Sequence, residues 1–280
     1  MFRENGAVLE NRMVAPAHYI LKIKSDRISR NAKPGQFVQI LCDDDYDPLL
    51  PRPFSFLTAT PKDFSVLYQV VGKGTKILSQ MKKGDTLCVV GPLGNGFNVS
   101  SSRRRGSADS RLRGNDIILL VGGGVGIPPL YHLAQVLLKN KTVRKENIHV
   151  FLGARDKSLL LCEKEFKKLG VVIHIATDNG SKGKKALVTE ILKYFLGHPQ
   201  STVRHARSIF TCGPTPMMKA VSMLAQTYEV PCQASVEVPM ACGFGACLGC
   251  AVKIKHQNEY RYALACQEGP VFHGDEMIWE

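Results

Sequence analysis

Hydrophobic and polar residues alternate along roughly the first hundred residues of the chain, and this period of two is typical of half-buried β-strands. Turn residues interrupt the alternation, as at Pro34-Gly35, Lys83-Gly84-Asp85 and Gly91-Pro92. The pattern predicts strands at residues 19–23, 36–41, 54–57, 66–71 and 87–90, with one short helix at 75–81. Short strands at this spacing predict an antiparallel β-barrel.

A different pattern follows from residue 116 onwards. Residues 117–121 form a run that is apolar on both faces, as parallel strands are, and residues 127–138 have helical spacing. The same alternation then repeats, with strands predicted at 148–152, 171–176, 208–211 and 234–236 and helices at 159–169, 187–195 and 216–226. Strands that alternate with helices in this way predict a doubly wound α/β unit.

The length of 280 residues exceeds a comfortable single core, so we expect an α+β multidomain protein. We place the barrel at residues 1–99, a basic segment at 100–115, the α/β unit at 116–236 and a short tail at 237–280. The longest apolar runs are far too short to cross a bilayer, and the N-terminus lacks the features of a secretory signal. We therefore expect a cytoplasmic protein without a membrane partner.

The formal net charge is +13, and one segment accounts for +4 of it. Residues 101–114 hold five arginines against one aspartate, among serines and glycines without apolar periodicity. Such a composition predicts a flexible insertion or linker. The remaining positive charge is scattered along the chain, so the composition does not favour a nucleic-acid partner.

The nine cysteines fall into two groups. Five stand alone and are expected to be small buried residues: Cys42, Cys88, Cys162, Cys212 and Cys232. The other four have the spacing C-x4-C-x2-C-x15-C and lie among glycines: Cys242, Cys247, Cys250 and Cys266. This is the plant-type spacing for a [2Fe-2S] cluster, which would also hold the short tail together. A zinc site, which more often pairs two C-x2-C knuckles, and unligated thiols are the alternatives.

A second motif lies on a predicted barrel strand and consists of Arg52, Pro53, Phe54 and Ser55. It is followed by Gly72-Lys73-Gly74-Thr75, which opens the short helix. An arginine can bind a pyrophosphate, a serine hydroxyl can reach a flavin ring, and glycines before a helix expose amides to phosphate. Each part alone fits an ordinary strand with a surface arginine. Their combination on a barrel favours FAD.

A third motif follows the buried strand at 117–121 and opens the next helix: Gly122, Gly123, Gly124 and Gly126. A dinucleotide phosphate needs this context, although Pro128 departs from G-x-G-x-x-G and a tight structural turn remains an alternative. Its predicted partner is the turn of Cys212, Gly213 and Pro214 at the end of a late strand, where Cys212 could also be a plain buried thiol. Arg155 favours NADP and Asp156 favours NAD. No histidine pairs visibly with a nucleophile, so we predict no catalytic side chain.

Taken together, these motifs resemble the ferredoxin-NADP reductase superfamily, and the match narrows to the electron-transfer subunits of class B, NAD-dependent dihydroorotate dehydrogenases. Five segments spread over nearly the whole chain carry the resemblance: Gly91–Phe97, Gly122–Leu130, Cys212–Met218, Met240–Cys250 and Cys266–Phe272. The resemblance implies FAD contacts at Arg52–Ser55, at Leu67, Tyr68 and Gln69, and at Gly74 and Thr75, with the four spaced cysteines as cluster ligands. Gln69 stands where an arginine is often seen, and the segment 101–114 looks like an insertion.

The function that this resemblance implies is electron transfer in pyrimidine biosynthesis. Electrons would pass from an FMN-containing dihydroorotate dehydrogenase catalytic subunit through [2Fe-2S] and FAD to NAD, in a heterotetramer of two catalytic and two electron-transfer subunits. A related FAD/[2Fe-2S] subunit of a sulfide dehydrogenase, transhydrogenase or hydrogenase is an alternative. An alternative of another class is a zinc-stapled module that binds nucleic acid.

Overall fold

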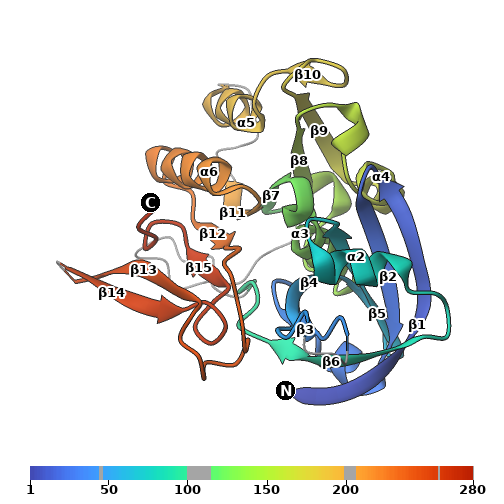
Figure 1. Cartoon of the computed structure of the whole chain (residues 1–280). Helices are drawn as coiled ribbons and strands as arrows, with labels where there is room; N and C mark the ends of the chain where they lie inside the picture. The colour runs from blue at the N-terminus through green and yellow to red at the C-terminus, as the bar shows by residue number, and fades with distance from the viewer. Residues whose placement is uncertain (44–46, 100–114, 199–205, 258, 280) are drawn as a thin grey trace.

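The computed structural model describes residues 1–43, 47–99, 115–198, 206–257 and 259–279. The predicted basic insertion at 101–114 lies outside the described residues. Figure 1 shows a barrel, a sheet covered by helices, and a tail that lies beside both. Among the described residues, no helix is both long and apolar enough to cross a membrane.

Six strands close into an antiparallel barrel in the order β1-β2-β5-β4-β3-β6. Alternate side chains point inward, and Phe56, Phe64 and Val38 are among those that fill the interior. The predicted barrel is confirmed, and each predicted strand overlaps an observed one. The elements are β1 (Phe2–Ala15), β2 (His18–Lys24), α1 (Asp26–Asn31), β3 (Phe37–Ile40), β4 (Arg52–Ala59), β5 (Asp63–Gln69), α2 (Lys73–Gln80) and β6 (Thr86–Leu93).

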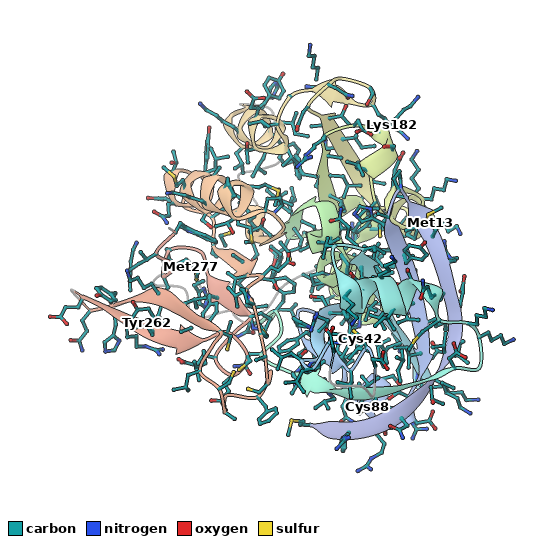
Figure 2. The ribbon with its side chains drawn as sticks, in the orientation of Figure 1. Met13, Cys42, Cys88, Lys182, Tyr262 and Met277 are labelled. Atoms are coloured by element: carbon teal, nitrogen blue, oxygen red, sulfur yellow. The ribbon has the colours of Figure 1, made fainter. Side chains whose placement is uncertain are left out.

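Strand β1 was not predicted from the sequence, although it closes the barrel by pairing with both β2 and β6. Most of its side chains are half-buried or exposed, and Figure 2 shows Met13 on its outer side. Because polar residues occupy many positions on both faces, the strand lacks the alternation that identifies its neighbours. Backbone hydrogen bonds to β2 on one side and β6 on the other hold β1 in the barrel and leave neither neighbour with a free edge.

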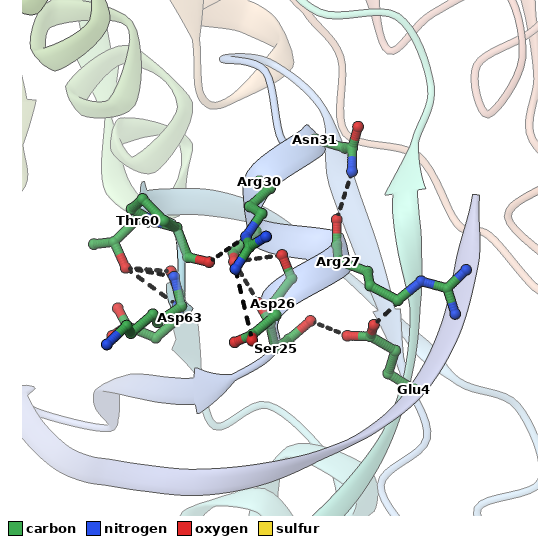
Figure 3. A network of polar contacts seen from close by, with 11 residues as sticks. Glu4, Ser25, Asp26, Arg27, Arg30, Asn31, Thr60 and Asp63 are labelled. Atoms are coloured by element: carbon green, nitrogen blue, oxygen red, sulfur yellow. Dashed lines mark hydrogen bonds and ion pairs between the residues drawn. The ribbon is translucent and has the colours of Figure 1, made fainter.

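The short helix α1 is held by polar contacts to the strands on either side (Figure 3). The Ser25 hydroxyl donates to the carboxylate of Glu4 on β1, and Arg27 lies 4.0 Å from the same carboxylate. The Arg30 Nε donates to the Pro61 carbonyl in the β4–β5 turn at 3.0 Å. These contacts tie α1 between β1 and the β4–β5 turn.

Seven strands form the second sheet, in the order β10-β9-β8-β7-β11-β12-β15, where β15 (Val271–His273) comes from the tail. Helices α3 and α4 contribute to the core on one face, and α5 and α6 to the core on the other, which confirms the doubly wound unit. The elements are β7 (Ile117–Gly123), α3 (Ile127–Lys139), β8 (Ile148–Ala154), α4 (Glu163–Leu169), β9 (Val172–Thr177), β10 (Lys184–Lys185), α5 (Val188–Gly197), β11 (Ala206–Cys212), α6 (Thr215–Thr227) and β12 (Cys232–Ser235).

The prediction that a helix begins at residue 159 was wrong by four residues. Helix α4 begins at Glu163, and a separate 3-10 turn covers Lys157–Leu159. Between them Cys162 has a φ of 57°, in the left-handed region that an α-helix cannot contain. The apolar spacing continues across the break, so the pattern alone did not reveal it.

The tail adds a hairpin of β13 (Ala251–His256) and β14 (Glu259–Leu264), and then β15 (Val271–His273), which joins the second sheet antiparallel to β12. Its core is shared with the other two parts of the chain. Phe37 and Leu93 come from the barrel, Met218 from α6, and Phe272 and Met277 from the tail. The tail is therefore packed by apolar contacts in addition to whatever its cysteines bind.

His132 is buried and His149 and His174 are half-buried, and the surroundings of all three rings favour the neutral form. Burial lowers the pKa of His132, on α3 beside Phe56, to about 4. His149 and His174 stack with ring centroids 5.4 Å apart on β8 and β9. Burial and then the neighbouring His174 lower the pKa of His149 to about 4, and burial and then Lys184 lower the pKa of His174.

We predict that the folded chain loses stability as the pH falls from about 6.5 towards 4. The unfolded chain takes up protons at these histidines near the ordinary pKa of about 6.5, whereas the folded chain binds them only at lower pH. Each such histidine contributes a slope of up to about 1.4 kcal/mol per pH unit. Denaturant unfolding of the wild type and of His132→Leu at several pH values tests this: the variant should have the shallower slope, and equal slopes would contradict it.

Candidate functional site

The four spaced cysteines come from two segments of the tail. Cys242, Cys247 and Cys250 lie in the loop between β12 and β13, and Cys266 follows β14. The loop turns sharply because Gly243, Gly245 and Leu248 have φ angles of 80°, 90° and 60°. Glycine adopts this left-handed conformation without strain, so the first two positions are suited to the turn.

The four thiols from these two segments are arranged in two pairs. Burial opposes ionisation of Cys242, but backbone amides of Phe244, Cys247 and Ala246 and the Cys247 side chain lower its pKa to about 6. Cys266 pairs with Cys250 instead, and its backbone N–H lies 3.5 Å from the Cys250 Sγ. Burial and the Cys250 side chain raise the pKa of Cys266 to about 12. The pairs are thus Cys242 with Cys247 and Cys250 with Cys266.

The donor set of four thiols from two chain segments fits a [2Fe-2S] cluster. A [2Fe-2S] cluster takes four thiolates spread over two irons. Two pairs of thiols, each with backbone amides directed at it, agree with that arrangement.

One side of the cysteine loop faces solvent. Cys250 and Cys266 are buried, whereas Cys247 is exposed and its neighbours Phe244 and Leu248 are 47% and 62% exposed. Figure 2 shows Tyr262 on the hairpin that extends from this region, away from the barrel. The exposed side of the loop therefore offers an apolar surface beside a thiol.

Two amide side chains connect the cysteine segments to each other and to the barrel. The Nε2 of Gln267, next to Cys266, donates to the Phe244 carbonyl at 3.0 Å. The Nδ2 of Asn95, just after β6, donates to the Gln267 and Glu268 carbonyls at 2.8 and 3.1 Å. Sequence reasoning gave neither residue a role, although both lie in segments that carry the family resemblance, Gly91–Phe97 and Cys266–Phe272.

The predicted flavin residues Arg52 and Gly74 lie together at the N-terminus of α2. A methyl group at Gly74 would lie 3.4 Å from the Arg52 Nε, so the guanidinium approaches the first turn of the helix closely. The Thr75 hydroxyl accepts the N–H groups of Val71 and Gly72 at 3.0 and 3.2 Å and is committed to the turn. The first helical amides have no intrahelical partner, so with Arg52 they form a site that fits a pyrophosphate.

The other predicted flavin residues are placed less uniformly. Pro53, Phe54 and Ser55 are half-buried on β4, where a planar ring system could contact them. Leu67 and Tyr68 are buried on β5, and the Tyr68 hydroxyl donates to Asn11 at 3.2 Å, with burial raising its pKa. Of the β5 trio only Gln69 is exposed. A contact from Leu67 or Tyr68 would therefore come from the backbone.

The glycine-rich turn and the Cys212 turn meet at the carboxyl ends of β7 and β11. These strands are neighbours, with Cys212 opposite Gly122, and the strand order reverses there because β8 lies on the other side of β7. A dinucleotide binds at such a switch point in open α/β sheets. Gly124, with a φ of 54°, faces open space, whereas a methyl group at Gly126 would lie 2.5 Å from the Cys212 carbonyl oxygen. The backbones of the two turns are thus in direct contact, with Gly126 packed against Cys212 and Gly213.

The side chains of the remaining residues predicted to contact the nucleotide are in part buried or already hydrogen-bonded within the protein. The Cys212 thiol is buried, and burial raises its pKa to about 12, so it is not a reactive group. The Asp156 carboxylate accepts the Ser158 backbone N–H at 2.7 Å and the Ser158 hydroxyl at 2.5 Å. Arg155 is exposed. These positions leave the choice between NAD and NADP to other observations.

Comparison with known proteins identifies the family. Residues 237–278 match the "Iron-sulfur cluster binding domain of dihydroorotate dehydrogenase B", and residues 120–223 match the "Oxidoreductase NAD-binding domain". A protein of Desulforamulus reducens, named "Dihydroorotate dehydrogenase B (NAD(+)), electron transfer subunit", is 40% identical over 99% of this chain and 98% of its own length. The chain belongs to this electron transfer subunit family. A Caldanaerobacter subterraneus member with the same name is 37% identical over 99% of both chains.

Solved structures support the same fold. The structure described as "Insights into flavin-based electron bifurcation via the NADH-dependent reduced ferredoxin-NADP oxidoreductase structure" has a TM-score of 0.79 at 32% identity, covering 98% of this chain and 90% of that one. A Neisseria gonorrhoeae ferredoxin NADP+ reductase with bound FAD and NADP, 15% identical with a TM-score of 0.61, shares the fold. The domains and fold of this electron transfer subunit family support FAD, an iron–sulfur cluster and NAD as cofactors.

We predict that Gly126→Ala weakens both folding and NADH binding. The added methyl group overlaps the backbone of Cys212, so the two turns must separate, which typically costs about 1–3 kcal/mol. Denaturant unfolding and a fluorescence titration with NADH measure the two effects. As a stability control, Gly72→Ala places its methyl group in open space on an extended backbone and should change the unfolding free energy by less than about 0.5 kcal/mol. Wild-type NADH affinity in Gly126→Ala would contradict the prediction.

Proposed function

We propose that this chain is the electron-transfer subunit that carries electrons from an FMN-containing dihydroorotate dehydrogenase catalytic subunit to NAD+. The route runs through a [2Fe-2S] cluster and FAD, in pyrimidine biosynthesis. One structural observation supports it above the others: the cysteine loop packs directly on barrel strand β3, whose neighbour is the predicted flavin strand β4. The names of the curated relatives favour dihydroorotate dehydrogenase among the possible partners.

The three parts of the chain would divide the cofactors among them. Residues 1–99 would bind FAD, 116–236 would bind NAD, and 237–280 would hold the cluster. The boundary at 237 separates proposed cofactor roles and not two independent folding units, because β15 from the tail pairs with β12 in the sheet of the middle part. The basic segment at 100–115 would link the two nucleotide-binding parts.

Each proposed contact follows from chemistry that the residues already show. Arg52 and the N-terminus of α2 would hold the FAD pyrophosphate, with Ser55 and Phe54 towards the flavin ring. Gly122–Gly126 and Cys212–Pro214 would border NAD through their backbone. Cys242 and Cys247 would ligate one iron and Cys250 and Cys266 the other. When bound, FAD supplies the exchange between two-electron transfer with NAD and single-electron transfer with the cluster.

The catalytic partner would meet this chain at the exposed side of the cysteine loop. Phe244, Cys247 and Leu248 are exposed there, and an exposed apolar surface beside a redox centre suits an interface. We propose an assembly of two catalytic and two electron-transfer subunits in the cytoplasm. Dihydroorotate itself would be oxidised in the partner.

We predict that anaerobically purified protein contains FAD and two irons with two sulfides per chain. After reconstitution with the FMN-containing catalytic subunit, the complex should reduce NAD+ when dihydroorotate is added. The catalytic subunit alone should not do so. Visible absorption, metal analysis and NADH formation measure these outcomes. Colourless protein that contains zinc, or a complex that forms no orotate, would contradict the proposed function.

A second prediction concerns Arg52. Replacing it with leucine removes charge-assisted hydrogen bonds of about 1.5–3 kcal/mol, so the dissociation constant for FAD should rise by about 10- to 150-fold while the iron content stays unchanged. Flavin fluorescence after dilution measures the constant. The matched control is Arg3→Leu, which removes an exposed arginine on β1 that contacts Cys88 instead. Equal FAD retention in both variants would exclude Arg52 as a contact.

A further inference from the structure

Gln39 lies between the predicted flavin strand and the cysteine loop. It is the third residue of β3, and its neighbour across the strand pair is Pro53 of the Arg52–Ser55 segment. On its other side it contacts the cysteine loop: a methyl group at Gly243, next to Cys242, would lie 2.6 Å from the Gln39 Cγ and 2.7 Å from its Nε2. Gln39 therefore pairs by its backbone with the predicted flavin strand and contacts the cysteine loop by its side chain.

The strand register explains why Gln39 points out of the barrel. Val38 and Ile40 belong to the barrel interior, so Phe37 and Gln39 project from the opposite face. Phe37 packs in the core that contains Cys250 and Cys266. It pairs with Ser55, just as Gln39 pairs with Pro53. The outer face of β3 and β4 thus presents Ser55 and Gln39 towards the tail.

The amide of Gln39 has no hydrogen-bond partner among the described residues. The side chain is only 1% exposed, yet neither Nε2 nor Oε1 makes a hydrogen bond there. A buried amide without partners is costly, so such groups in native proteins normally bond to another protein group, an ordered water or a bound ligand. The nitrogen end lies against Gly243, so the amide presents a donor to the cysteine loop.

Gln233 shows what a structural glutamine looks like in this protein. It is also buried, on β12, but its Oε1 accepts the Asn98 backbone N–H at 2.9 Å and its Nε2 donates to the Asn98 carbonyl at 2.8 Å. Both polar atoms of Gln233 are used to join two chain segments. Gln39 is buried as well but has no such role.

We infer that Gln39 is a positioning residue for electron transfer, whose Nε2 donates a hydrogen bond to a sulfur atom of the bound cluster on the side that faces FAD. Four thiolates and two sulfides accept such bonds, and a donor to sulfur stabilises the more negative reduced cluster. The bond raises the reduction potential of the cluster, and the side chain fixes the spacing between the cysteine loop and β4. The inference rests on the proposed function, because it requires a cluster on these cysteines.

The test is an EPR-monitored redox titration of the cluster in wild type, Gln39→Met and Gln233→Met, each with FAD bound. Methionine keeps the length of glutamine but cannot donate. The reduction equilibrium of the cluster in Gln39→Met should shift about tenfold towards the oxidised form, or about 59 mV for one electron. Gln233→Met should destabilise the fold and leave the potential at the wild-type value.

A cluster-free measurement and a second variant separate positioning from packing. In the cofactor-free chain Gln39→Met should be at least as stable to denaturant as the wild type, because it removes unmet polar groups, whereas Gln233→Met should be less stable. Gln39→Glu keeps the size and shape of the side chain. In this variant the reduction potential of the cluster should be lowest at high pH, where the carboxylate cannot donate, and should rise again at low pH, where the protonated carboxyl donates a hydrogen bond.

The outcomes distinguish the two proposals. An intact cluster with wild-type potential and EPR spectrum in both Gln39 variants overturns the inference and leaves the proposed function standing. A potential that moves equally in Gln233→Met also overturns it, since the effect would then be structural. Wild-type protein that carries no [2Fe-2S] cluster overturns both.

Discussion

The spatial relation of the three candidate sites depends on how the tail is fixed between the barrel and the sheet. Strand β15 adds to β12 by backbone hydrogen bonds, and Asn95 binds the chain just after Cys266. The apolar core of the tail includes residues from all three parts of the chain. A site whose members come from separate units works only if those units cannot slide, and these contacts supply that rigidity.

The two proposed nucleotide sites are built mainly from backbone. Several side chains that the motifs single out are occupied by internal bonds, among them Thr75 in its turn and Asp156 at Ser158. What remains is a pair of strand-to-helix turns whose amides point outward, with Arg52 as the added charge. Recognition of a phosphate mainly by backbone amides would explain why glycines dominate both motifs.

Local patterns were sufficient for most of the fold. Period-two alternation located β2 to β6, and the apolar run at 117–121 located the first strand of the sheet. Strand β1 and helix α1 escaped because their polar residues are stabilised by pairing and by contacts such as Ser25 with Glu4, which no local pattern records. The cysteines were identified by spacing alone. Gln39 could not be identified in this way, because in the sequence it is one polar residue in a short strand. Only its contact with Gly243, about two hundred residues later in the chain, distinguishes it.

The position of β15 has a consequence for the cysteine loop. All four spaced cysteines lie between β12 and β15, and those two strands are neighbours in one sheet. Sheet pairing therefore closes the chain into a loop before any metal is bound, and the entropy of that closure is offset by backbone hydrogen bonds and apolar packing. A cluster on these cysteines would have to order only a loop whose two ends are already held together. Its loss would leave the pairing of β12 with β15 in place.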